Sequence, residues 1–236
     1  MPNGKDINHY GALGPQFHEY GAKVAKVDQR TQRSKQSRQE IMNKILDAAI
    51  IEFSQYGFQG VSTQAIAERA NLKKSQLHYY IEDKEALYSK VLGKVLDGWR
   101  TIFCFDAHPD MSARDSISAF VRLKFRFALE NPELSRIFTM EILSGGERLE
   151  KYWPYSIANT HSKVLHIQRW VSNGEMRTLD GRLLIMHIWA LTQYYSDYTM
   201  QAELLMGASL SDSETCSKIE QELVTFVLMG CGIPIQ

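Results

Sequence analysis

Residues 61–87 read VSTQAIAERANLKKSQLHYYIEDKEAL, and this stretch decides the fold. The hydroxyl side chains of Ser62 and Thr63 each offer a capping oxygen for a short helix that ends near residue 70. Asn71 then supplies a break, because asparagine tolerates the left-handed conformation that a tight interhelical turn requires. A second short helix is predicted from about Lys73 to Tyr80.

A longer helix is predicted before this stretch. Ser37 and Glu40 form a capping box, in which the serine oxygen accepts from an orphan amide and the glutamate reaches back. Gly57 provides the stop. Apolar residues recur every four positions between these two ends, as expected for one buried helix face: Ile41, Ile45, Ala49 and Phe53.

After the two short helices, Asp83 caps a further helix that starts at Lys84 and continues through Val95. Two short helices joined by a turn of three or four residues, packed on a longer first helix, form a helix-turn-helix unit. In such a unit the second short helix enters the DNA major groove and the first lies across the backbone.

The same stretch resembles the TetR family of regulators over about residues 38–91. The residues that carry the resemblance are Ile45 to Ala49, Phe53, Gly57, Phe58, Gly60 to Thr63, Ile66, Ala67, Ala70, Leu77, Tyr79, Tyr80 and Lys84 to Leu87. This chain departs from the family pattern at Asn71, Lys73, His78 and Ile81. Because lysine cannot accept an amide hydrogen bond, Lys73 leaves the start of its helix less firmly capped.

The resemblance implies a role for each matching residue. Leu77 matches a buried position, and Lys73 belongs to the expected DNA-binding set at the start of the helix. Positions that face the groove in the family are occupied by Lys74, Ser75, Gln76 and Tyr79. Positions that touch phosphate are occupied by Thr63, His78, Tyr80 and Lys84. Without the surrounding pattern, paired lysines on a short helix more often form a solvated face.

Charge is unevenly distributed along the chain. The 236 residues carry a net charge of zero, but residues 23–38 contain six basic residues and one acidic residue. We therefore predict a flexible basic N-terminal arm over 1–36, a helix-turn-helix DNA-binding domain over 37–91 and a helical effector-binding and dimerisation domain over 92–236. The arm has the composition to follow a phosphate backbone or enter a minor groove, and equally that of a disordered, solubilising tail.

The third region is also predicted to be helical. Asn131 and Pro132 open a helix over 133–143 that Ser144–Gly146 closes. Asp180 caps a long helix over 182–205 that ends near Gly207, and a capping box at 211–214 opens the last helix. No strand pattern is visible, so the chain is predicted to be all-α with roughly nine helices.

The last two helices carry apolar residues that a monomer would struggle to cover. In the TetR family the corresponding helices join two subunits, and a homodimer suits a palindromic operator. The alternative is that Leu223, Phe226 and Val227 close the core of the monomer itself.

The C-terminal region further resembles the pyrimidine-utilisation repressors of the TetR family. The resemblance lies in residues 96–99, 121–124, 131–132, 135–143, 188–198 and 207–210. It implies a small-molecule effector such as uracil, and the expected ligand-binding residues are Trp99, Phe138, Trp189, Gln193 and Tyr195.

The residue types alone support a pocket of this kind. Trp189 and Gln193 are four residues apart and share a helix face, and Ser196 or Asp197 follows one turn later. Aromatic faces and an amide suit a flat heterocycle with carbonyl and N–H groups. An aromatic-rich helix is, on the other hand, more often core than pocket. A larger hydrophobic metabolite, or no effector at all, are the alternatives.

An enzyme is not expected. The sequence lacks a nucleophile elbow, a phosphate loop and the usual zinc motifs, and it indicates no cofactor. Cys104 and His108 are four residues apart, but two ligands are weak evidence for a metal site. With three scattered cysteines, no secretory signal and no apolar run of membrane-spanning length, the chain is expected in the cytoplasm.

Overall fold

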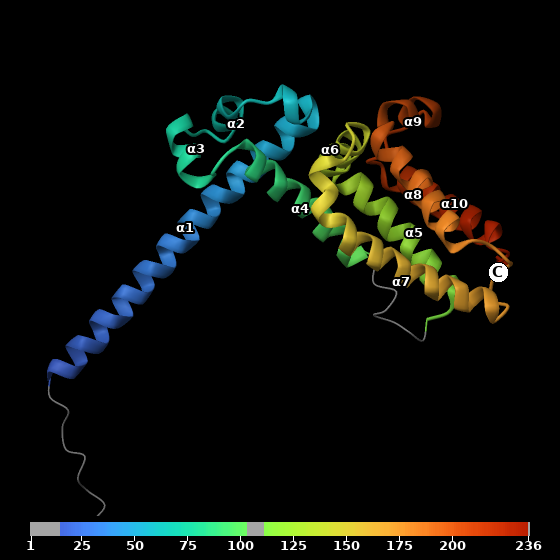
Figure 1. The fold of residues 1–236 in the computed structure, drawn as a ribbon, viewed down its shortest axis with the longest axis horizontal. Coiled ribbons are helices and arrows are strands. Elements are labelled where there is room, and N and C mark those ends of the chain that lie inside the picture. Colours follow the sequence, from blue (N-terminus) through green and yellow to red (C-terminus); the bar gives the residue numbers. More distant parts are fainter. Residues whose placement is uncertain (1–14, 103–110, 236) are drawn as a thin grey trace, which may run out of the picture. The chain divides into compact units, whose positions relative to one another are not determined.

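The computed structural model describes the backbone of residues 15–102 and 111–235, and the side chains of residues 35–99 and 111–235. The chain divides into two compact units, residues 1–45 and residues 46–236. Within the described backbone there are ten α-helices, one 3₁₀ helix and no strand (Figure 1). This confirms the predicted all-α class.

The first unit and the start of the second share α1 (Pro15–Gly60). The predicted helix start at Ser37 is wrong, because the backbone is helical from Pro15 onward and Ser37 lies inside the helix. The physical reason is that no glycine or proline occurs between Gly21 and Gly57, so nothing interrupts helix propagation. Helix α1 therefore continues through residue 36, and no break in the helix separates the proposed flexible arm over 1–36 from the residues that follow it. Residues 1–14 lie outside the described part of the chain.

Gly57 does interrupt α1, as predicted. Its φ of 66° and ψ of 177° are not helical, and they turn the chain before the last residues of α1. Glycine adopts this conformation without the steric cost that a side chain adds.

The second unit continues with α2 (Thr63–Arg69), α3 (Lys74–Tyr80) and α4 (Lys84–Ile102). Ser62 is the residue that caps α2, since its Oγ accepts from the amide of Ala65 at 3.1 Å. Asp83 caps α4, with its Oδ1 2.7 Å from the amide nitrogen of Ala86. A core of apolar residues joins these helices and includes Ala49, Phe53, Ile66, Leu77, Leu87 and Tyr88.

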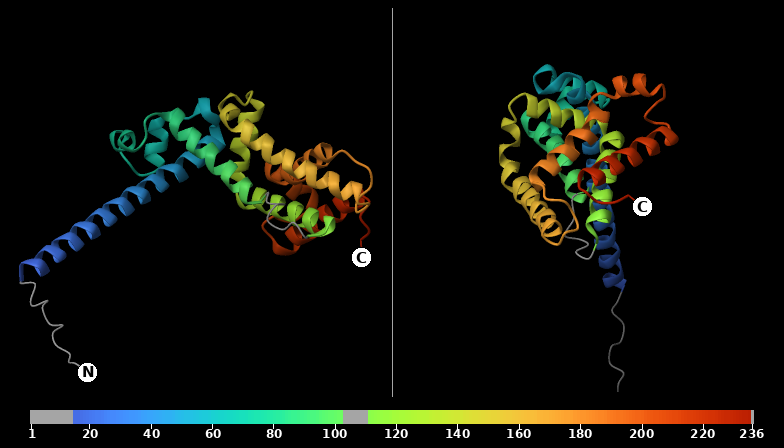
Figure 2. Two further views of the ribbon diagram at one scale, coloured as in Figure 1. Left: turned by 60° about the horizontal axis from the view of Figure 1, so that its bottom comes forward. Right: turned by 90° about the vertical axis from the view of Figure 1, so that its right-hand side faces the viewer.

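The remaining helices are α5 (Ala113–Glu130), α6 (Pro132–Leu143), the 3₁₀ helix η2 (Glu147–Tyr152), α7 (Trp153–Ser172), α8 (Gly181–Asp197), α9 (Thr199–Met206) and α10 (Ser213–Gly230). Two of them are central (Figure 2). Helix α5 contacts α4, α6, α8 and α10, whereas α8 contacts α5, α6, α7, α9 and α10. A cluster of buried apolar side chains from α5, α7, α8, α9 and α10 forms the core between them.

Three details of the predicted helix ends need correction. Pro132 opens α6 as predicted, but the Asn131 side chain donates back to the carbonyl of Phe127 instead of capping. The predicted helix over 182–205 is broken at Tyr198, next to the point where the Thr199 hydroxyl donates to the Tyr195 carbonyl. The cap of α10 is Asp212, one residue later than predicted, with its Oδ2 2.8 Å from the amide of Thr215.

Candidate nucleic-acid interface and ligand cavity

The turn between α2 and α3 forms around a residue in the left-handed conformation. Asn71 has a φ of 57°, as the sequence predicted. The amide of Leu72 donates to the carbonyl of Ala67 at 2.8 Å, and that of Asn71 donates to Glu68 at 3.0 Å. These two bonds satisfy the last carbonyls of α2 in the manner of a Schellman motif, with asparagine where glycine is usual. They fix the direction in which α3 leaves the turn.

Helix α3 shows one face to the core and the rest to solvent. Leu77 has 0% exposure and is the buried residue of this helix. Tyr80 and, on α2, Thr63 are half-buried. The other expected contact residues are exposed: Lys73, Lys74, Ser75, Gln76, His78 and Tyr79. This places the predicted base-reading and phosphate-binding residues of α3 on an accessible surface.

Gln76 has a structural role in addition to its predicted reading of bases. Its Oε1 accepts from the amide of Lys73 at 2.8 Å, which satisfies one of the orphan donors at the start of α3. Because Lys73 cannot cap by accepting a bond, this glutamine provides half of a capping box from the inside of the helix.

Lys84 makes several contacts within the protein in addition to its predicted contact with phosphate. Its Nζ donates to the carbonyls of Phe58 and Val61, each at 2.9 Å, and lies 4.3 Å from the Phe58 ring centroid. Two of its three N–H groups are therefore used to fix the turn between α1 and α2. Its contact with phosphate remains a prediction.

A cavity of about 760 Å³ lies in the C-terminal region and is lined by residues of α4 to α8. Four of the five expected ligand-binding residues line it: Trp99, Phe138, Trp189 and Gln193. The rings of Trp99 and Phe138 meet edge to face with centroids 4.2 Å apart. The aromatic residues of this region therefore form a cavity wall as well as core.

Tyr195 is the exception, and its assignment to the pocket is corrected. It does not line the cavity but packs edge-on against Phe125, with ring centroids 5.4 Å apart. Burial raises the pKa of its hydroxyl. The reason is helical geometry: Tyr195 lies two residues from Gln193, so the two side chains occupy different faces of α8.

A chain of hydrogen bonds runs along the cavity wall. The Nζ of Lys124 donates to Gln193 Oε1 at 3.3 Å, and Gln193 Nε2 donates to Asp197 Oδ1 at 3.0 Å. Asp197 Oδ2 accepts from Thr139 Oγ1 at 2.9 Å. Helices α5, α8 and α6 are thus linked through side chains that all line the cavity.

Lys124 is the unusual member of this chain. Its side chain is almost completely buried and its Nζ lies 4.5 Å from the Trp99 ring centroid. Burial lowers the pKa of this ammonium to about 8, and the neighbouring carboxylate of Asp197 opposes the shift. Lys124 therefore loses its proton more easily than an exposed lysine does, and it lies on the wall of the cavity, where a ligand can interact with it.

Sequence reasoning did not assign Lys124 to the site. The signal was present, since Lys124 falls on the apolar face of α5 in step with Ile117, Phe120 and Val121. A charged residue at a core position of an amphipathic helix indicates a functional or paired group. Thr139, Asn159 and Lys163 also line the cavity, and no pattern in the sequence singled them out.

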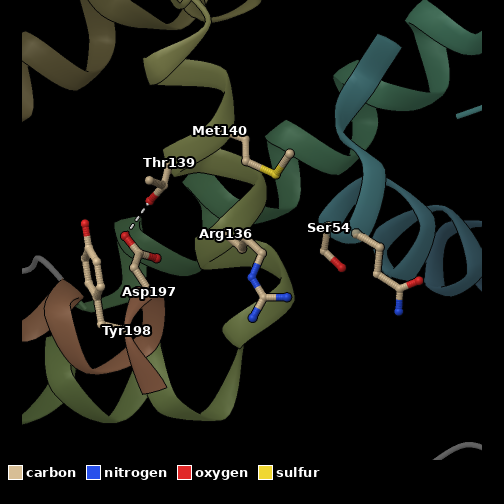
Figure 3. A pocket seen from close by; sticks show the side chains of 7 residues that line it. Ser54, Arg136, Thr139, Met140, Asp197 and Tyr198 are labelled. Carbon is tan, nitrogen blue, oxygen red and sulfur yellow. Dashed lines mark hydrogen bonds between the residues drawn. The ribbon is translucent and has the colours of Figure 1, made fainter. Parts of the chain in front are cut away.

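Thr139 and Asp197 line a second, shallower pocket as well. Figure 3 shows it between α6, the end of α8 and α1, with the Thr139–Asp197 hydrogen bond on one side and Ser54 on the other. The Arg136 side chain points into this pocket. The two residues therefore form a common wall between the ligand cavity and a site that α1 borders.

Neither a metal centre nor a membrane helix is found in the part of the chain that the structure describes. No group of three or more potential metal ligands occurs among these residues. None of their helices is long and apolar enough to span a bilayer. Cys104 and His108, which the sequence raised as a weak metal pair, lie outside the described residues.

Comparison with known proteins agrees with this arrangement. The model "Bacterial regulatory proteins, tetR family" matches residues 45–91, and "YcdC-like protein, C-terminal region" matches residues 92–234. The HTH-type transcriptional regulator RutR of Escherichia coli K12 is 35% identical over 188 residues, which cover 79% of this chain and 88% of RutR.

Solved structures share the fold at lower identity. A tetR-family regulatory protein from Rhodococcus RHA1 has a TM-score of 0.65 at 17% identity, covering 83% of this chain and 98% of its own. AibR, solved with isovaleryl coenzyme A and operator DNA, has a TM-score of 0.60 at 16% identity, covering 79% and 97%. The N-terminal and C-terminal matches together span both predicted functional regions, and the chain therefore belongs to the TetR family of bacterial transcriptional regulators.

Proposed function

We propose that this regulator is a repressor that binds a palindromic operator as a homodimer and leaves it when a small molecule occupies the cavity. The observation that carries the DNA-binding part is the exposure of every α3 side chain that is expected to meet bases, while Leu77 anchors the helix in the core. Lysine suits guanine acceptors and glutamine the edge of adenine, so Lys74 and Gln76 read bases in this proposal.

The test of DNA binding is a footprint on the region upstream of the regulator's own gene. Affinity is expected to fall steeply with salt, since basic side chains such as Lys84 and those of the segment over residues 23–38 neutralise phosphates and thereby release counterions. Truncation of residues 1–35 should lower affinity and leave the preferred sequence unchanged if the basic segment follows phosphates. Failure to protect any site at low salt would contradict the proposal.

The effector is proposed to be a planar pyrimidine such as uracil. A pyrimidine is considered because this chain is 35% identical to RutR and resembles the pyrimidine-utilisation repressors. The polar groups of the cavity also suit such a ligand. The Gln193 amide uses one N–H and one oxygen lone pair within the protein, which leaves one donor and one acceptor for a ligand. A lactam edge, with a carbonyl beside an N–H, matches that pair.

Two tryptophans that line the same cavity carry unpaired donors. The indole N–H groups of Trp99 and Trp189 are buried and have no hydrogen-bond partner among the described residues. A buried donor without an acceptor costs about 1–3 kcal/mol, so a carbonyl oxygen brought by a ligand is a favourable partner. Aromatic faces supply the stacking surface that a flat ring prefers.

Thermal-shift and calorimetric measurements with uracil and other nucleobases test this assignment. Gln193→Leu keeps a similar volume but removes both hydrogen-bonding groups, and it should weaken uracil binding by about 1–3 kcal/mol. Operator affinity without ligand should stay nearly unchanged. A folded Gln193→Leu variant that still leaves the operator normally on addition of uracil would contradict a pyrimidine at this site.

A larger hydrophobic effector is the second candidate, because apolar side chains surround the outer part of the cavity. Leu143 is 81% exposed and Tyr155 is 61% exposed, and both line the cavity together with Ile142. AibR was solved with an acyl coenzyme A thioester. Release of the operator by acyl thioesters and not by nucleobases would favour this alternative. A regulator without any effector would leave the cavity unexplained.

The dimer is proposed from exposed apolar side chains on the last helices. Within the described residues, large exposed hydrophobic side chains gather on α8, α9 and α10: Leu183, Met186, Met200, Leu204, Leu205, Met206, Phe226 and Met229. The alternative to a dimer was that Leu223, Phe226 and Val227 close the core of the monomer itself. Leu223 and Val227 are indeed buried in the monomer. Phe226 remains available to a second copy.

We further propose that the chain has no enzymatic activity. The relatives of known description are regulators. The polar side chains of the cavity are hydrogen-bonded to one another, and this arrangement suits the binding of a ligand. Turnover of any ligand found to bind would contradict this.

A further inference from the structure

The side-chain amide of Gln193 lies between two residues of opposite hydrogen-bonding character. The Nζ of Lys124 donates to its Oε1 at 3.3 Å, and its Nε2 donates to Asp197 Oδ1 at 3.0 Å. A lysine ammonium has donors and no acceptor, whereas a carboxylate has acceptors and no donor. The chain of hydrogen bonds therefore has one direction, from Lys124 through Gln193 to Asp197.

This direction gives the amide a single stable orientation. If the amide turned over, its NH₂ group would face the ammonium of Lys124 and its oxygen would face the carboxylate of Asp197. Both hydrogen bonds would be lost. Because Lys124 is only 3% exposed, little water is available to replace the lost acceptor, and a buried polar group without a partner is costly.

The two flanking residues are themselves held by helices other than α8. The Nζ of Lys124, on α5, lies 4.5 Å from the centroid of the Trp99 ring on α4. The second carboxylate oxygen of Asp197 accepts from the hydroxyl of Thr139, on α6, at 2.9 Å. The orientation of the amide is therefore set by the packing of α4, α5 and α6 around α8.

The groups that Gln193 leaves for a ligand have the same direction. One lone pair of its oxygen remains on the side of Lys124, and one N–H group remains on the side of Asp197. A lactam that pairs with this amide places its own N–H toward Lys124 and its carbonyl toward Asp197. The same ring turned over would bring N–H against N–H and oxygen against oxygen.

The direction decides where a substituent on the ring lies. A group on the carbon next to the paired N–H is on the side of the Lys124 ammonium, and a group next to the paired carbonyl is on the side of the Asp197 carboxylate. An anionic substituent is attracted at the first position and repelled at the second.

We propose that Lys124 and Asp197 are positioning residues that hold the Gln193 amide in one orientation, so that the cavity reads the lactam edge of its effector in a single direction. The favoured ligand class is a planar lactam with an acidic substituent next to its N–H group. This rests on the proposed pyrimidine site at Gln193 and deepens it.

Isothermal titration calorimetry with two isomers tests the direction. Uracil-6-carboxylate carries its carboxylate next to an N–H group, and uracil-5-carboxylate carries it next to a carbonyl. The two have the same composition and the same acidic group, so their comparison isolates its position on the ring. We expect the 6-carboxylate to bind about tenfold more tightly, as a hydrogen bond to a charged group provides. Uracil itself is measured beside them.

Variants at the two ends of the chain assign the preference. Lys124→Arg keeps a cation that only donates and should retain the preference for the 6-carboxylate. Lys124→Met removes the cation, and Asp197→Asn introduces an amide that donates as well as accepts, so each should reduce the preference to about twofold or less. Lys151→Met, at an exposed lysine that also lines the cavity, is the matched control and should retain it.

The measured quantity is the ratio of the two affinities, because a variant that only loosens the cavity weakens both isomers alike. A preference that survives Lys124→Met arises from another group of the lining and overturns the proposal. Melting curves identify variants that fail to fold, and the comparison of isomers in the wild-type protein does not depend on them.

The outcomes in the wild-type protein separate this proposal from the pyrimidine site. Binding of uracil with equal affinities for the two isomers, with a preference for the 5-carboxylate, or with rejection of both isomers, overturns the single direction and leaves the pyrimidine site in place. Binding of the 6-carboxylate over the 5-carboxylate without binding of uracil supports the direction and contradicts uracil as the effector. No binding of any of the three overturns both.

Discussion

The guanidinium of Arg148 lies over the ring of Phe58, with its central carbon 3.9 Å from the ring centroid. Lys84 lies 4.3 Å from the same centroid. Phe58 belongs to the end of α1 and Lys84 opens α4. Arg148 belongs to η2, which ends at the cavity-lining Tyr152 and is followed by Trp153. A single ring therefore contacts a cation near the helix-turn-helix and a cation near the cavity.

Phe58→Leu should uncouple ligand binding from DNA binding. The substitution removes both cation–π contacts, each worth about 0.5–2 kcal/mol, and keeps an apolar side chain. Operator affinity and effector affinity measured separately should change little, while the effector's reduction of operator affinity becomes smaller. A gel-shift titration with and without the effector measures this coupling.

Tyr56→Leu, at a 59% exposed aromatic residue on the other side of Gly57 from Phe58, is the control for that experiment. It should leave the coupling unchanged. An undiminished response in Phe58→Leu would show that the signal takes another route, such as the Thr139–Asp197 wall shared by the two pockets.

Gln76 variants should separate base reading from helix capping. Gln76→Ala removes the acceptor for the Lys73 amide and the predicted base contact, so it should lower stability by about 1 kcal/mol and relax preference at one base pair by about 1–3 kcal/mol. Gln76→Glu keeps an acceptor and should retain stability while still changing the base preference. Binding to a library of operator variants, with melting curves, measures both effects.

Gln64→Ala is the matched control, since Gln64 is an exposed glutamine on α2 that bonds within its own helix to Glu68. It should leave the base preference intact. If Gln76→Ala also leaves it intact, α3 is placed wrongly against the groove.

Lys124→Met should stabilise the protein most at neutral pH. In the folded state burial lowers the pKa of Lys124 to about 8 from 10.5, so the unfolded chain binds more protons between these values. Stability of the wild type therefore rises as pH increases from about 8 to 10.5, and below pH 8 the buried charge costs at most about 3 kcal/mol. Urea unfolding at pH 7, 8, 9 and 10 should show the advantage of Lys124→Met shrinking with pH.

Lys90→Met, at an exposed lysine of α4, should show no such trend in the same series. A stability difference between Lys124→Met and wild type that is constant from pH 7 to 10 would mean that Lys124 is not buried as a charge.

Phe226→Asp should weaken the proposed dimer. Phe226 is 61% exposed on α10, and a carboxylate in an apolar interface is costly to desolvate. Analytical ultracentrifugation should show a shift toward monomer, and operator affinity should fall with it because half-sites are then bound singly. Leu165→Asp on α7, where the side chain is 63% exposed, is the control and should remain dimeric. A dimer as stable in Phe226→Asp as in Leu165→Asp would place the interface elsewhere.

Local chemistry made the helix-turn-helix readable from the sequence. Ser62, Asn71 and Asp83 act where they were expected, because capping and left-handed turns depend on one residue and its neighbours. The start of α1 was misplaced for a related reason. A capping box at Ser37 is compatible with a helix start but does not force one, and the residues before it propagate a helix equally well.

The sequence by itself determined the all-helical class, the caps of α2 and α4 and the turn at Asn71, since these follow from periodicity and from side chains that act on adjacent backbone, and its resemblance to the TetR family pointed to the family. Only the tertiary structure decided that Tyr195 faces the core and that Lys124, Gln193 and Asp197 share one hydrogen-bonded chain. Lys124 and Gln193 are 69 residues apart, and their contact depends on how α5 and α8 pack. Packing of distant helices is set by the whole core, which no local pattern encodes.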